Sequence, residues 1–392
     1  MKQPLYSAIV LGDSTNNTLS IVRSLGEAKI EQTLILKCDE DICLVAKSKY
    51  LKNSRVYRIS TIEDCMPILE QLKESTTKQQ TIICSFDEAA VFIDKKESIL
   101  APFFRTPARG KQIGMLFNKD EQCKLAKKCG LTVPKSIIFH REEKINNLIF
   151  DYPILLKPLN STKGEKSDIH ICQNEEEVEN ALNAESSCSD FILQEFIDKE
   201  YEIDCIGVRT EKETFLAGGI RKIRHYPQLI GAGAYGLFKP IREYNINIQG
   251  IEEFLIQANY YGPFSIEFLH KADKDYFMEV NFRNEGLAYA ATSAGANLHA
   301  LYLNPNMKIK RNKIHKVYMM NYSLDFLYVK NGSLSLWIWI RDLLRTRCFI
   351  NINFKDLQPT IHYYKNKITS KFTTNLWKRR IKRDKCLRNA CQ

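Results

Sequence analysis

Residues 264–284 read FSIEFLHKADKDYFMEVNFRN, the clearest β-hairpin pattern in this sequence. Two stretches in which apolar and polar residues alternate flank a polar turn at 270–275, as in two antiparallel strands joined by a turn. Pairing that is symmetric about Asp273 places Glu267 opposite Glu279, and alternation adds Asn281 and Arg283 to their face. The other face then carries Ile266, Phe268, Met278, Val280 and Phe282.

The two opposed glutamates predict a cation site. Like charges that face each other destabilise a sheet, and Mg²⁺ in proteins takes carboxylate oxygens together with substrate phosphates and water. A solvated sheet face on which Glu267 and Glu279 splay apart explains the hairpin by itself at least as well. Features elsewhere in the chain decide between these two interpretations.

Residues 1–105 have the pattern of an open parallel α/β unit. Strand-like stretches at 6–11, 33–38 and 81–85 follow one another, and an amphipathic stretch at 18–27 follows the first. The turn after the first strand has the single glycine Gly12 rather than a Gly-x-Gly-x-x-Gly fingerprint, which argues against a dinucleotide site. In the centre of the chain, strands joined by polar turns with helices between them predict an α+β region.

Positive charge is concentrated at the C-terminal end. The formal net charge is +11, yet residues 330–392 alone carry 15 Lys and Arg against three Asp and Glu, so the remainder is close to neutral. All three tryptophans lie in this end as well. Trp interleaved with Lys and Arg is typical of segments that lie on an anionic membrane. The alternative is that Trp337 and Trp339 pack under the body of the protein. No nucleic-acid partner is expected, because no recognised nucleic-acid-binding fold accompanies the charge.

The sequence gives no sign of export or of a membrane span. It has no run of about 18 apolar residues, and its N-terminus enters a strand-like stretch without a cleavage signal. The 12 cysteines are scattered without a Cys-x-x-Cys pair or zinc spacing, so we expect mostly small core residues or inert thiols. We expect a cytoplasmic protein, located at the inner face of the membrane if the C-terminal end binds there.

Five sequence features occur in the order and approximate spacing of the ATP-grasp superfamily. They are Lys119 in NKDEQ, Lys157 in ILLKP, QEFI at 194–197, Glu200 in EYEID, and the hairpin with Glu267, Glu279 and Asn281. Over about residues 1–310 the chain resembles the carboxylate–amine ligases, the group that includes D-alanine–D-alanine ligase and D-aspartate ligase. The resemblance implies an ATP-grasp fold, mixed α/β and α+β. It implies an N-terminal α/β (pre-ATP-grasp) domain at 1–110, a small subdomain at 111–190, a large subdomain with the metal site at 191–320, and a basic C-terminal extension at 321–392.

The same resemblance implies a nucleotide site. Two lysines would bind the phosphates as compact charges, and the glycine-containing loop 160–167 would close over them. The adenine would meet the QEFI segment, and an acidic residue would bind the ribose. The implied ATP-binding residues are Lys119, Lys157, Gly164, Glu195, Phe196, Ile197 and Glu200, with Glu202 as the alternative ribose ligand. The implied ligands of two Mg²⁺ ions, or of Mn²⁺ in their place, are Glu267, Glu279 and Asn281.

Segment 218–236, GGIRKIRHYPQLIGAGAYG, is the expected substrate loop. It contains an expected anion-binding cluster of Arg221, Lys222, Arg224 and His225, although a basic strand followed by an ordinary glycine turn is the alternative. D-Alanine–D-alanine ligase has an arginine two residues before its first metal carboxylate, where this chain has Ser265. We expect Arg283 to contact the acyl phosphate or a substrate carboxylate instead, and Gly286 to approach the acceptor.

These features together predict an ATP-dependent ligase. ATP would phosphorylate a carboxylate, Arg283 and Arg221 would hold the acyl phosphate, and an amine would attack it to give an amide, ADP and phosphate. The products would be dipeptide-like, or an amino acid joined to a cell-envelope or polysaccharide precursor. Two alternatives stay open: an ATP-grasp enzyme that forms another C–N or C–O bond, and a non-catalytic ATP-binding adaptor whose tail docks to membranes or a partner.

Overall fold

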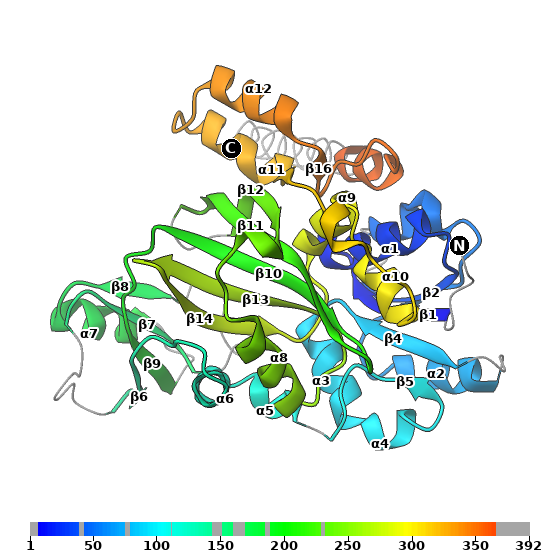
Figure 1. The fold of residues 1–392 in the computed structure, drawn as a ribbon, viewed down its shortest axis with the longest axis horizontal. Helices are drawn as coiled ribbons and strands as arrows, with labels where there is room; N and C mark the ends of the chain where they lie inside the picture. The colour runs from blue at the N-terminus through cyan, green and yellow to red at the C-terminus, as the bar shows by residue number, and fades with distance from the viewer. Residues whose placement is uncertain are drawn as a thin grey trace, which may run out of the picture.

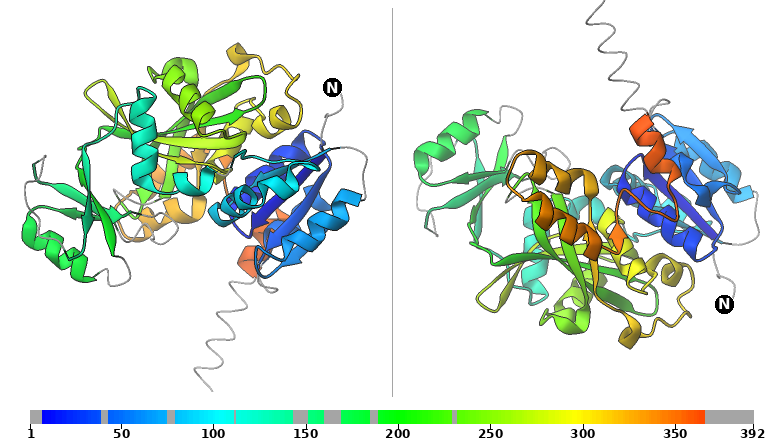
Figure 2. Two further views of the ribbon diagram at one scale, coloured as in Figure 1. Left: turned by 90° about the horizontal axis from the view of Figure 1, so that it is seen from below. Right: turned by 90° about the horizontal axis from the view of Figure 1, so that it is seen from above.

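The computed structural model describes residues 7–38, 43–74, 79–110, 112–142, 151–159, 169–184, 189–228 and 232–365. These residues form three β-sheets (Figure 1). A small sheet lies on one side of the large central sheet, the N-terminal sheet lies on the other, and the last helices cover one end of the central sheet (Figures 1 and 2). The arrangement is the mixed α/β and α+β architecture that the sequence predicts.

The N-terminal sheet is parallel, as expected. Its strand order, β3-β2-β1-β4-β5, reverses direction between β1 and β4. Helix α1 packs on one face, whereas α2 and α3 pack on the other. The elements are β1 (Ser7–Asp13), α1 (Asn16–Glu27), β2 (Gln32–Lys37), η1 (Val45–Lys47), η2 (Lys49–Leu51), β3 (Val56–Ile59), α2 (Cys65–Glu74), β4 (Gln80–Cys84), α3 (Asp87–Lys95), α4 (Glu97–Leu100) and β5 (Phe104–Arg105). Because the strand order reverses there, the carboxyl ends of β1 and β4 flank a crevice.

The small sheet is antiparallel, with the order β6-β9-β7-β8. It has its own apolar core, which includes Leu156, Phe191 and Val178 of helix α7. Two helices, α5 and α6, precede it in the chain. The elements are α5 (Ile113–Leu116), α6 (Lys119–Lys128), β6 (Ser136–His140), β7 (Ile154–Pro158), β8 (His170–Cys172), α7 (Glu175–Ala184) and β9 (Asp190–Glu195).

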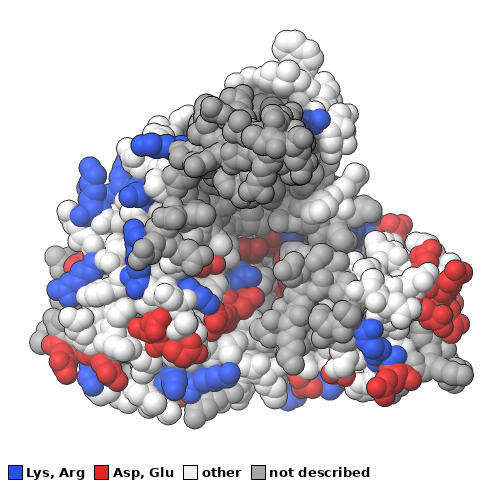
Figure 3. Space-filling model, turned by 180° about the vertical axis from the view of Figure 1, so that it is seen from behind, with Lys and Arg blue, Asp and Glu red and all other residues white. Residues whose placement is uncertain are grey.

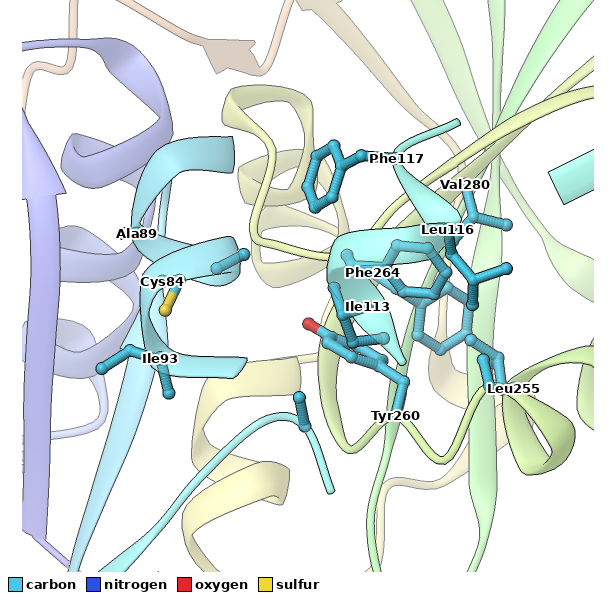
Figure 4. Packing of buried hydrophobic residues seen from close by; sticks show 14 of the residues in the cluster. Cys84, Ala89, Ile93, Ile113, Leu116, Phe117, Leu255, Tyr260, Phe264 and Val280 are labelled. Carbon is cyan, nitrogen blue, oxygen red and sulfur yellow. The ribbon is translucent and has the colours of Figure 1, made fainter. Parts of the chain in front are cut away.

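The central sheet has the order β14-β13-β10-β11-β12-β15-β16 and is antiparallel except for its last pair. Its elements are β10 (Tyr201–Arg209), β11 (Thr214–Tyr226), β12 (Ala232–Pro240), η4 (Ile241–Glu243), α8 (Ile248–Gln257), β13 (Gly262–Lys271), β14 (Lys274–Asn281), β15 (Val317–Met320) and β16 (Cys348–Phe349). A continuous apolar core joins this sheet to the N-terminal unit. In Figure 4, Ile113, Leu116 and Phe117 lie between Ile93 of α3 and Val280 of β14.

The hairpin register predicted at the acidic pair is confirmed. Glu267 is paired with Glu279, and Ser265 is paired with Asn281. The turn is shorter than expected, because the strands continue to Lys271 and Lys274. Ala272 and Asp273 have positive φ angles of 48° and 59°, which is the conformation of a two-residue hairpin turn.

A β-bulge after Glu267 absorbs the difference in turn length, so that Phe268 is paired with Phe277. Met278 of β14 therefore has no partner on β13, and the alternation of side chains between the two faces of the sheet is interrupted there. Phe277 is fully buried in the core, whereas Met278 is half-buried and lines a pocket. The expectation that Met278 lies on the apolar face is wrong, because a bulge cannot be read from the alternating pattern.

The described part of the C-terminal extension packs on the rest of the chain. Its helices are α11 (Tyr322–Lys330) and α12 (Leu336–Arg345). Between the hairpin and the extension lie η5 (Gly286–Ala288), α9 (Tyr289–Ser293), α10 (Leu298–Leu303) and η6 (Arg311–Lys313). Trp339 is buried against Tyr322 and Phe326, whereas Trp337 is 79% exposed. Trp377, together with the other residues after 365, lies outside the described residues.

Two further expectations concern the cysteines and the membrane. Cys38 and Cys43 form a disulfide, so these two are not the inert thiols that the sequence predicts. The other described cysteines are buried thiols. Among the described helices, none combines the length and the apolar composition needed to cross a bilayer.

Candidate active site

A pocket lies where the small sheet meets β10, β13 and β14 of the central sheet. Its lining comes from both sheets and from the start of α6. One wall is apolar and includes Leu155, Ile171, Phe196, Ile197 and Met278. The other carries charged side chains of both signs, namely Lys119, Lys157, Lys199, Glu202, Lys222, Glu267 and Glu279. Figure 3 shows the molecule hollowed on one face, with acidic and basic side chains side by side in the hollow.

The two predicted phosphate-binding lysines, Lys119 and Lys157, meet in this pocket. Lys119 is the first residue of α6, whose N-terminus is capped by the Asn118 side chain. Lys157 lies in β7 with 4% exposure, and its Nζ donates to Gln194 Oε1 at 3.0 Å. Burial, followed by the nearby charge of Lys119, lowers the Lys157 pKa to about 8. Two neighbouring ammonium groups and a helix N-terminus form an environment that favours an anion.

The predicted adenine segment lines the same pocket only in part. Phe196 and Ile197 are lining residues. Glu195 is not, because its Oε2 accepts from the Lys135 backbone N–H at 3.1 Å. The apolar wall beside Phe196 and Ile197 suits a flat aromatic base.

The structure separates the two acids that were considered for the ribose. Glu200 Oε1 accepts from Ala272 N at 3.1 Å, so this side chain supports the turn of the β13–β14 hairpin. Glu202 lines the pocket and pairs with Lys199 and Lys222. Burial acts to raise its pKa, but the adjacent cations outweigh burial and lower the Glu202 pKa.

The opposed carboxylates of Glu267 and Glu279 both face the pocket. Asn281 follows Glu279 on the same strand but does not line the pocket: its Nδ2 donates to Ser265 Oγ at 3.1 Å, and its Oδ1 accepts from Arg283 Nη2 at 3.0 Å. Sequence reasoning missed Gln122, whose side chain bonds to both backbone groups of Val280, at 3.2 and 2.7 Å. This double bond fixes α6, and with it Lys119, against the strand that carries Glu279. Carboxylate and amide oxygens beside two lysines are a suitable donor set for Mg²⁺ bound to a nucleotide triphosphate.

Residues 117–222 match the family model of the RimK-like ATP-grasp domain. This segment is an ATP-grasp domain. It contains Lys119, Lys157, Glu202 and Lys222, whereas Glu267 and Glu279 follow it. No match is found among curated protein sequences.

Solved structures share the fold. An L-amino acid ligase from Bacillus licheniformis is 15% identical, with 81% of this chain and 80% of that chain covered and a TM-score of 0.59. N5-carboxyaminoimidazole synthetase from Staphylococcus aureus, complexed with ADP, is 14% identical, with 83% and 85% covered and a TM-score of 0.62. The biotin carboxylase domain of Hydrogenobacter thermophilus 2-oxoglutarate carboxylase, in complex with MgADP, is 15% identical, with 80% and 73% covered and a TM-score of 0.60. These similarities confirm the expected ATP-grasp fold.

The pocket lined by Lys119, Lys157, Glu267 and Glu279, which we call the ATP-grasp pocket, contains an ion cluster around Lys222. The Lys222 Nζ lies 2.8 Å from Asp204, 3.2 Å from Glu202 and 3.4 Å from Glu267. Burial alone would lower the Lys222 pKa, but the surrounding carboxylates hold it well above its ordinary value. Oxygens of Asp204, Glu267 and Glu285 also lie within 4.8 Å of one another, a spacing that could hold a metal ion.

Sequence reasoning missed Asp204 and Glu285 in this cluster. The signal for Asp204 was present, because alternation in EYEID places Glu202 and Asp204 on one face of β10. The register then pairs Glu202 with Lys222 and Asp204 with Glu267. Which strands become neighbours of β10 could not be read from the sequence.

The expected basic cluster does not form as one group. Arg221 is exposed and stacks on the Tyr201 ring, 4.2 Å from its centroid, on the face opposite to Lys222. Arg224 bonds to Asp325 at 2.8 and 2.9 Å and to Asp342 at 2.8 Å. Strand alternation separates Arg221 from Lys222, and the guanidinium of Arg224 is already neutralised.

Arg283 follows β14, the strand that carries Glu279, and one of its three guanidinium nitrogens has no hydrogen-bond partner among the described residues. Its Nε donates to Asp87 Oδ1 at 2.8 Å, and its Nη2 donates to Asn281 Oδ1 at 3.0 Å. Nη1 is buried without a hydrogen-bond partner among the described residues, a state that favours an anionic ligand. Asp87 comes from the N-terminal unit and was not predicted.

Gly286 lies at the contact between the ATP-grasp region and the N-terminal unit. Its N–H donates to Asn17 Oδ1 at 2.7 Å, and a Cβ at this position would lie 3.2 Å from Asn16 Cβ. Gly164 and the loop 160–167 lie outside the described residues.

Proposed function

We propose that this protein is an ATP-dependent ligase that joins a carboxylate to an amine through an acyl phosphate. The observation that carries the proposal is the meeting of Lys119 and Lys157 with the opposed Glu267 and Glu279 in one pocket of an ATP-grasp fold. The Arg283 Nη1, buried beside Asn281, supplies a further donor for an anion. The related L-amino acid ligase supports an amide-forming reaction on this fold.

The proposed reaction has two steps, and in each the atoms and charges of reactants and products are equal. An oxygen of the carboxylate attacks the γ-phosphorus of ATP, the bond from that phosphorus to the β,γ-bridging oxygen breaks, and ADP leaves. The amine nitrogen then attacks the acyl carbon, the carbon–oxygen bond to phosphate breaks, and the proton lost by the amine leaves with the phosphate. Amide, ADP and phosphate are the products.

The residues of the pocket contribute position and charge to these steps. Lys119 and Lys157 would bind the phosphates, and Glu267, Glu279 and Asn281 would hold two Mg²⁺ ions, with Mn²⁺ as a substitute. The ions neutralise charge that develops during phosphoryl transfer. Glu202 lines the pocket, whereas Glu200 does not, and for this reason Glu202 is the residue proposed to bind the ribose.

The substrates we propose are small molecules: an amino acid as one partner, and an amine or acid of a cell-envelope or polysaccharide precursor as the other. Arg283, with its free Nη1, is the residue proposed to contact the acyl phosphate. Lys222 is proposed to orient the neighbouring carboxylates of Glu202, Asp204 and Glu267 and to neutralise part of their charge. Arg221 and Arg224 are proposed only as peripheral substrate contacts, because both are engaged elsewhere.

We further propose that α12 contacts an anionic membrane surface. Support comes from the exposed side chains of Trp337, Arg341, Leu344 and Arg345 on this helix. Sedimentation with vesicles containing phosphatidylglycerol should retain the protein, and Trp337→Ala with Leu344→Ala should release it. Equal retention of the double variant would refute this contact.

Thermal unfolding tests the nucleotide site. MgATP should raise the melting temperature of the full chain, since a ligand at 100 times its Kd stabilises by about 2.7 kcal/mol. Glu279→Ala should lose this shift, whereas Glu253→Ala, on the exposed side of α8, should keep it. An undiminished shift in Glu279→Ala would remove the metal assignment.

Phosphate release tests the reaction. Release should stay near background with ATP alone and rise when a carboxylate and an amine are supplied together from a library of amino acids, amino sugars and uronic acids. Mass spectrometry should then detect the amide. ATP binding without turnover for every pair would favour the non-catalytic adaptor.

A further inference from the structure

A second cavity lies between the N-terminal sheet and the C-terminal end of the described chain. We call it the C-terminal pocket; its polar lining includes Thr15, Asn16, Asn351, Thr360, Tyr363 and Tyr364. Its volume is about 310 Å³, within the range of about 300–1,000 Å³ that is usual for small-molecule sites. None of its lining residues belongs to the pocket with Lys119 and Glu279.

The floor of the C-terminal pocket comes from the segments that follow β1 and β2. Thr15 and Asn16 follow the carboxyl end of β1, and Leu44 follows β2. Ligands of open parallel sheets bind outside the carboxyl ends of the strands. Asp13 Oδ1 accepts from the backbone and the hydroxyl of Thr15, at 3.2 and 2.6 Å, which fixes the loop.

Residues 350–365 form the roof of the C-terminal pocket, and buried hydrogen bonds to the N-terminal unit hold this segment in place. Asp356 is buried and accepts from Arg23 Nε at 3.1 Å and from the Lys49 backbone at 2.9 Å. Arg23, equally buried, also donates to the Ile350 carbonyl at 2.7 Å. A buried ion pair with these bonds is costly to break, so residues 350–365 form a fixed wall of the cavity.

The lining selects a neutral ligand that has both hydroxyl groups and apolar faces. Among the described residues that line the C-terminal pocket there is no Asp, Glu, Lys, Arg or His. A free amino acid or a phosphate would enter without a countercharge, which is unfavourable. Hydroxyl and amide side chains can both donate and accept hydrogen bonds, while Leu19 and Leu44 add apolar surface.

Two tyrosines complete this chemistry. The rings of Tyr363 and Tyr364 are edge to face, with centroids 5.2 Å apart, and both line the cavity. Aromatic rings offer a flat apolar face together with a polar hydroxyl. A sugar ring combines C–H faces with hydroxyls around its edge, and so matches both parts of the lining.

We propose that the C-terminal pocket binds a neutral sugar ring. Building on the proposed ligase function, this sugar belongs to the substrate that is joined in the ATP-grasp pocket. Asn16 lines the C-terminal pocket and lies against Gly286, three residues after Arg283, the residue proposed to contact the acyl phosphate. The pocket thereby selects a saccharide-linked substrate over a free amino acid.

Saturation-transfer NMR on the full chain tests the proposal. The probes are the neutral sugars N-acetylglucosamine, galactose and glucose, compared with uracil and L-alanine. We expect saturable binding of at least one sugar, and an affinity loss of about fivefold or more in Tyr364→Ala and in Asn16→Ala. Tyr364→Phe, which keeps the ring, should lose less. Ile361→Ala, on the same helical stretch and 53% exposed, is the matched control and should bind as the parent does.

The outcomes separate this proposal from the ligase function. Glu279→Ala should keep its sugar affinity although it loses the MgATP shift, because its side chain lies in the other pocket. If Tyr364→Ala weakens sugar binding but no substrate pair gives turnover, the ligase function is refuted and the sugar site is still supported. Absence of saturable sugar binding, stronger binding of uracil or L-alanine, or unchanged binding in both pocket variants would overturn the sugar site.

Discussion

Lys157 should make ATP binding depend on pH above neutrality. Its ammonium group is buried and lies near Lys119, and its pKa is lowered to about 8 from the usual 10.5. Bound phosphates favour the protonated lysine and so raise this pKa again. ATP binding is therefore coupled to the uptake of a proton wherever free Lys157 is partly neutral.

The size of the effect follows from that pKa. Free Lys157 would be about nine-tenths protonated at pH 7 and about one-tenth protonated at pH 9. If the bound form stays protonated, the apparent Kd for ATP rises about tenfold between these two values. Binding should take up about half a proton at pH 8 and nearly one at pH 9.

Titration calorimetry in two buffers with different ionisation enthalpies measures the proton uptake directly. A nonhydrolysable ATP analogue with Mg²⁺ avoids turnover. Lys157→Gln should bind more weakly and lose the pH dependence. Lys119→Gln should move the dependence to higher pH, because Lys119 is the charge that helps to lower the Lys157 pKa. Lys128→Gln, at the exposed end of α6, is the control.

A Kd that is the same at pH 7 and pH 9, with no proton uptake at pH 9, would refute the reasoning. Retention of the full pH dependence by Lys157→Gln would do so as well, because the effect would then arise at another group. Either result would mean that Lys157 does not contact the phosphates, or that it is charged in the free protein at pH 9.

Three further predictions concern residues outside the phosphate site. Asp87→Asn should lower kcat/KM about tenfold by releasing Arg283, with recovery in Asp87→Glu; an unchanged value would show that the ion pair is not needed. Lys222→Met should lower the free energy of unfolding in urea by about 3–5 kcal/mol, because Asp204 is left buried without its countercharge; a loss below 1 kcal/mol (roughly that of an exposed pair) would contradict this. His299 is buried and burial lowers its pKa to about 3, so the unfolded chain takes up a proton below about pH 6.5 and stability falls by about 2 kcal/mol from pH 6.5 to pH 5. His299→Gln should show that much less acid sensitivity, and identical pH profiles would refute it.

The hairpin shows how far local patterning reaches. Alternation with a period of two determines which side chains share a face, so Glu267 and Glu279 could be placed opposite each other without a structure. The same pattern cannot reveal a bulge, because a bulge adds one residue without changing the composition. Met278 was therefore assigned to the wrong face, and its role in the pocket wall was missed.

The basic residues of β11 show what the sequence pattern could not predict. A run of Lys and Arg reveals where positive charges lie along the chain, but not which side chains will pair with them. Lys222 meets Asp204 only because β11 and β13 both pair with β10, and Arg224 meets Asp325 only because α11 packs beside β11. Neutralisation of these cations is a property of neighbouring strands and helices that are distant in sequence.

By itself the sequence determined the parallel N-terminal unit and the acidic pair of the hairpin, because each rests on short-range periodicity. The order of the lysine, QEFI and glutamate motifs was recognised through the resemblance to the ATP-grasp superfamily. Only the tertiary structure decided that Asp87 reaches Arg283 and that residues 350–365 close a cavity over β1. Such contacts depend on how whole units pack, and packing is set by the shape of buried surfaces that come from many separate segments.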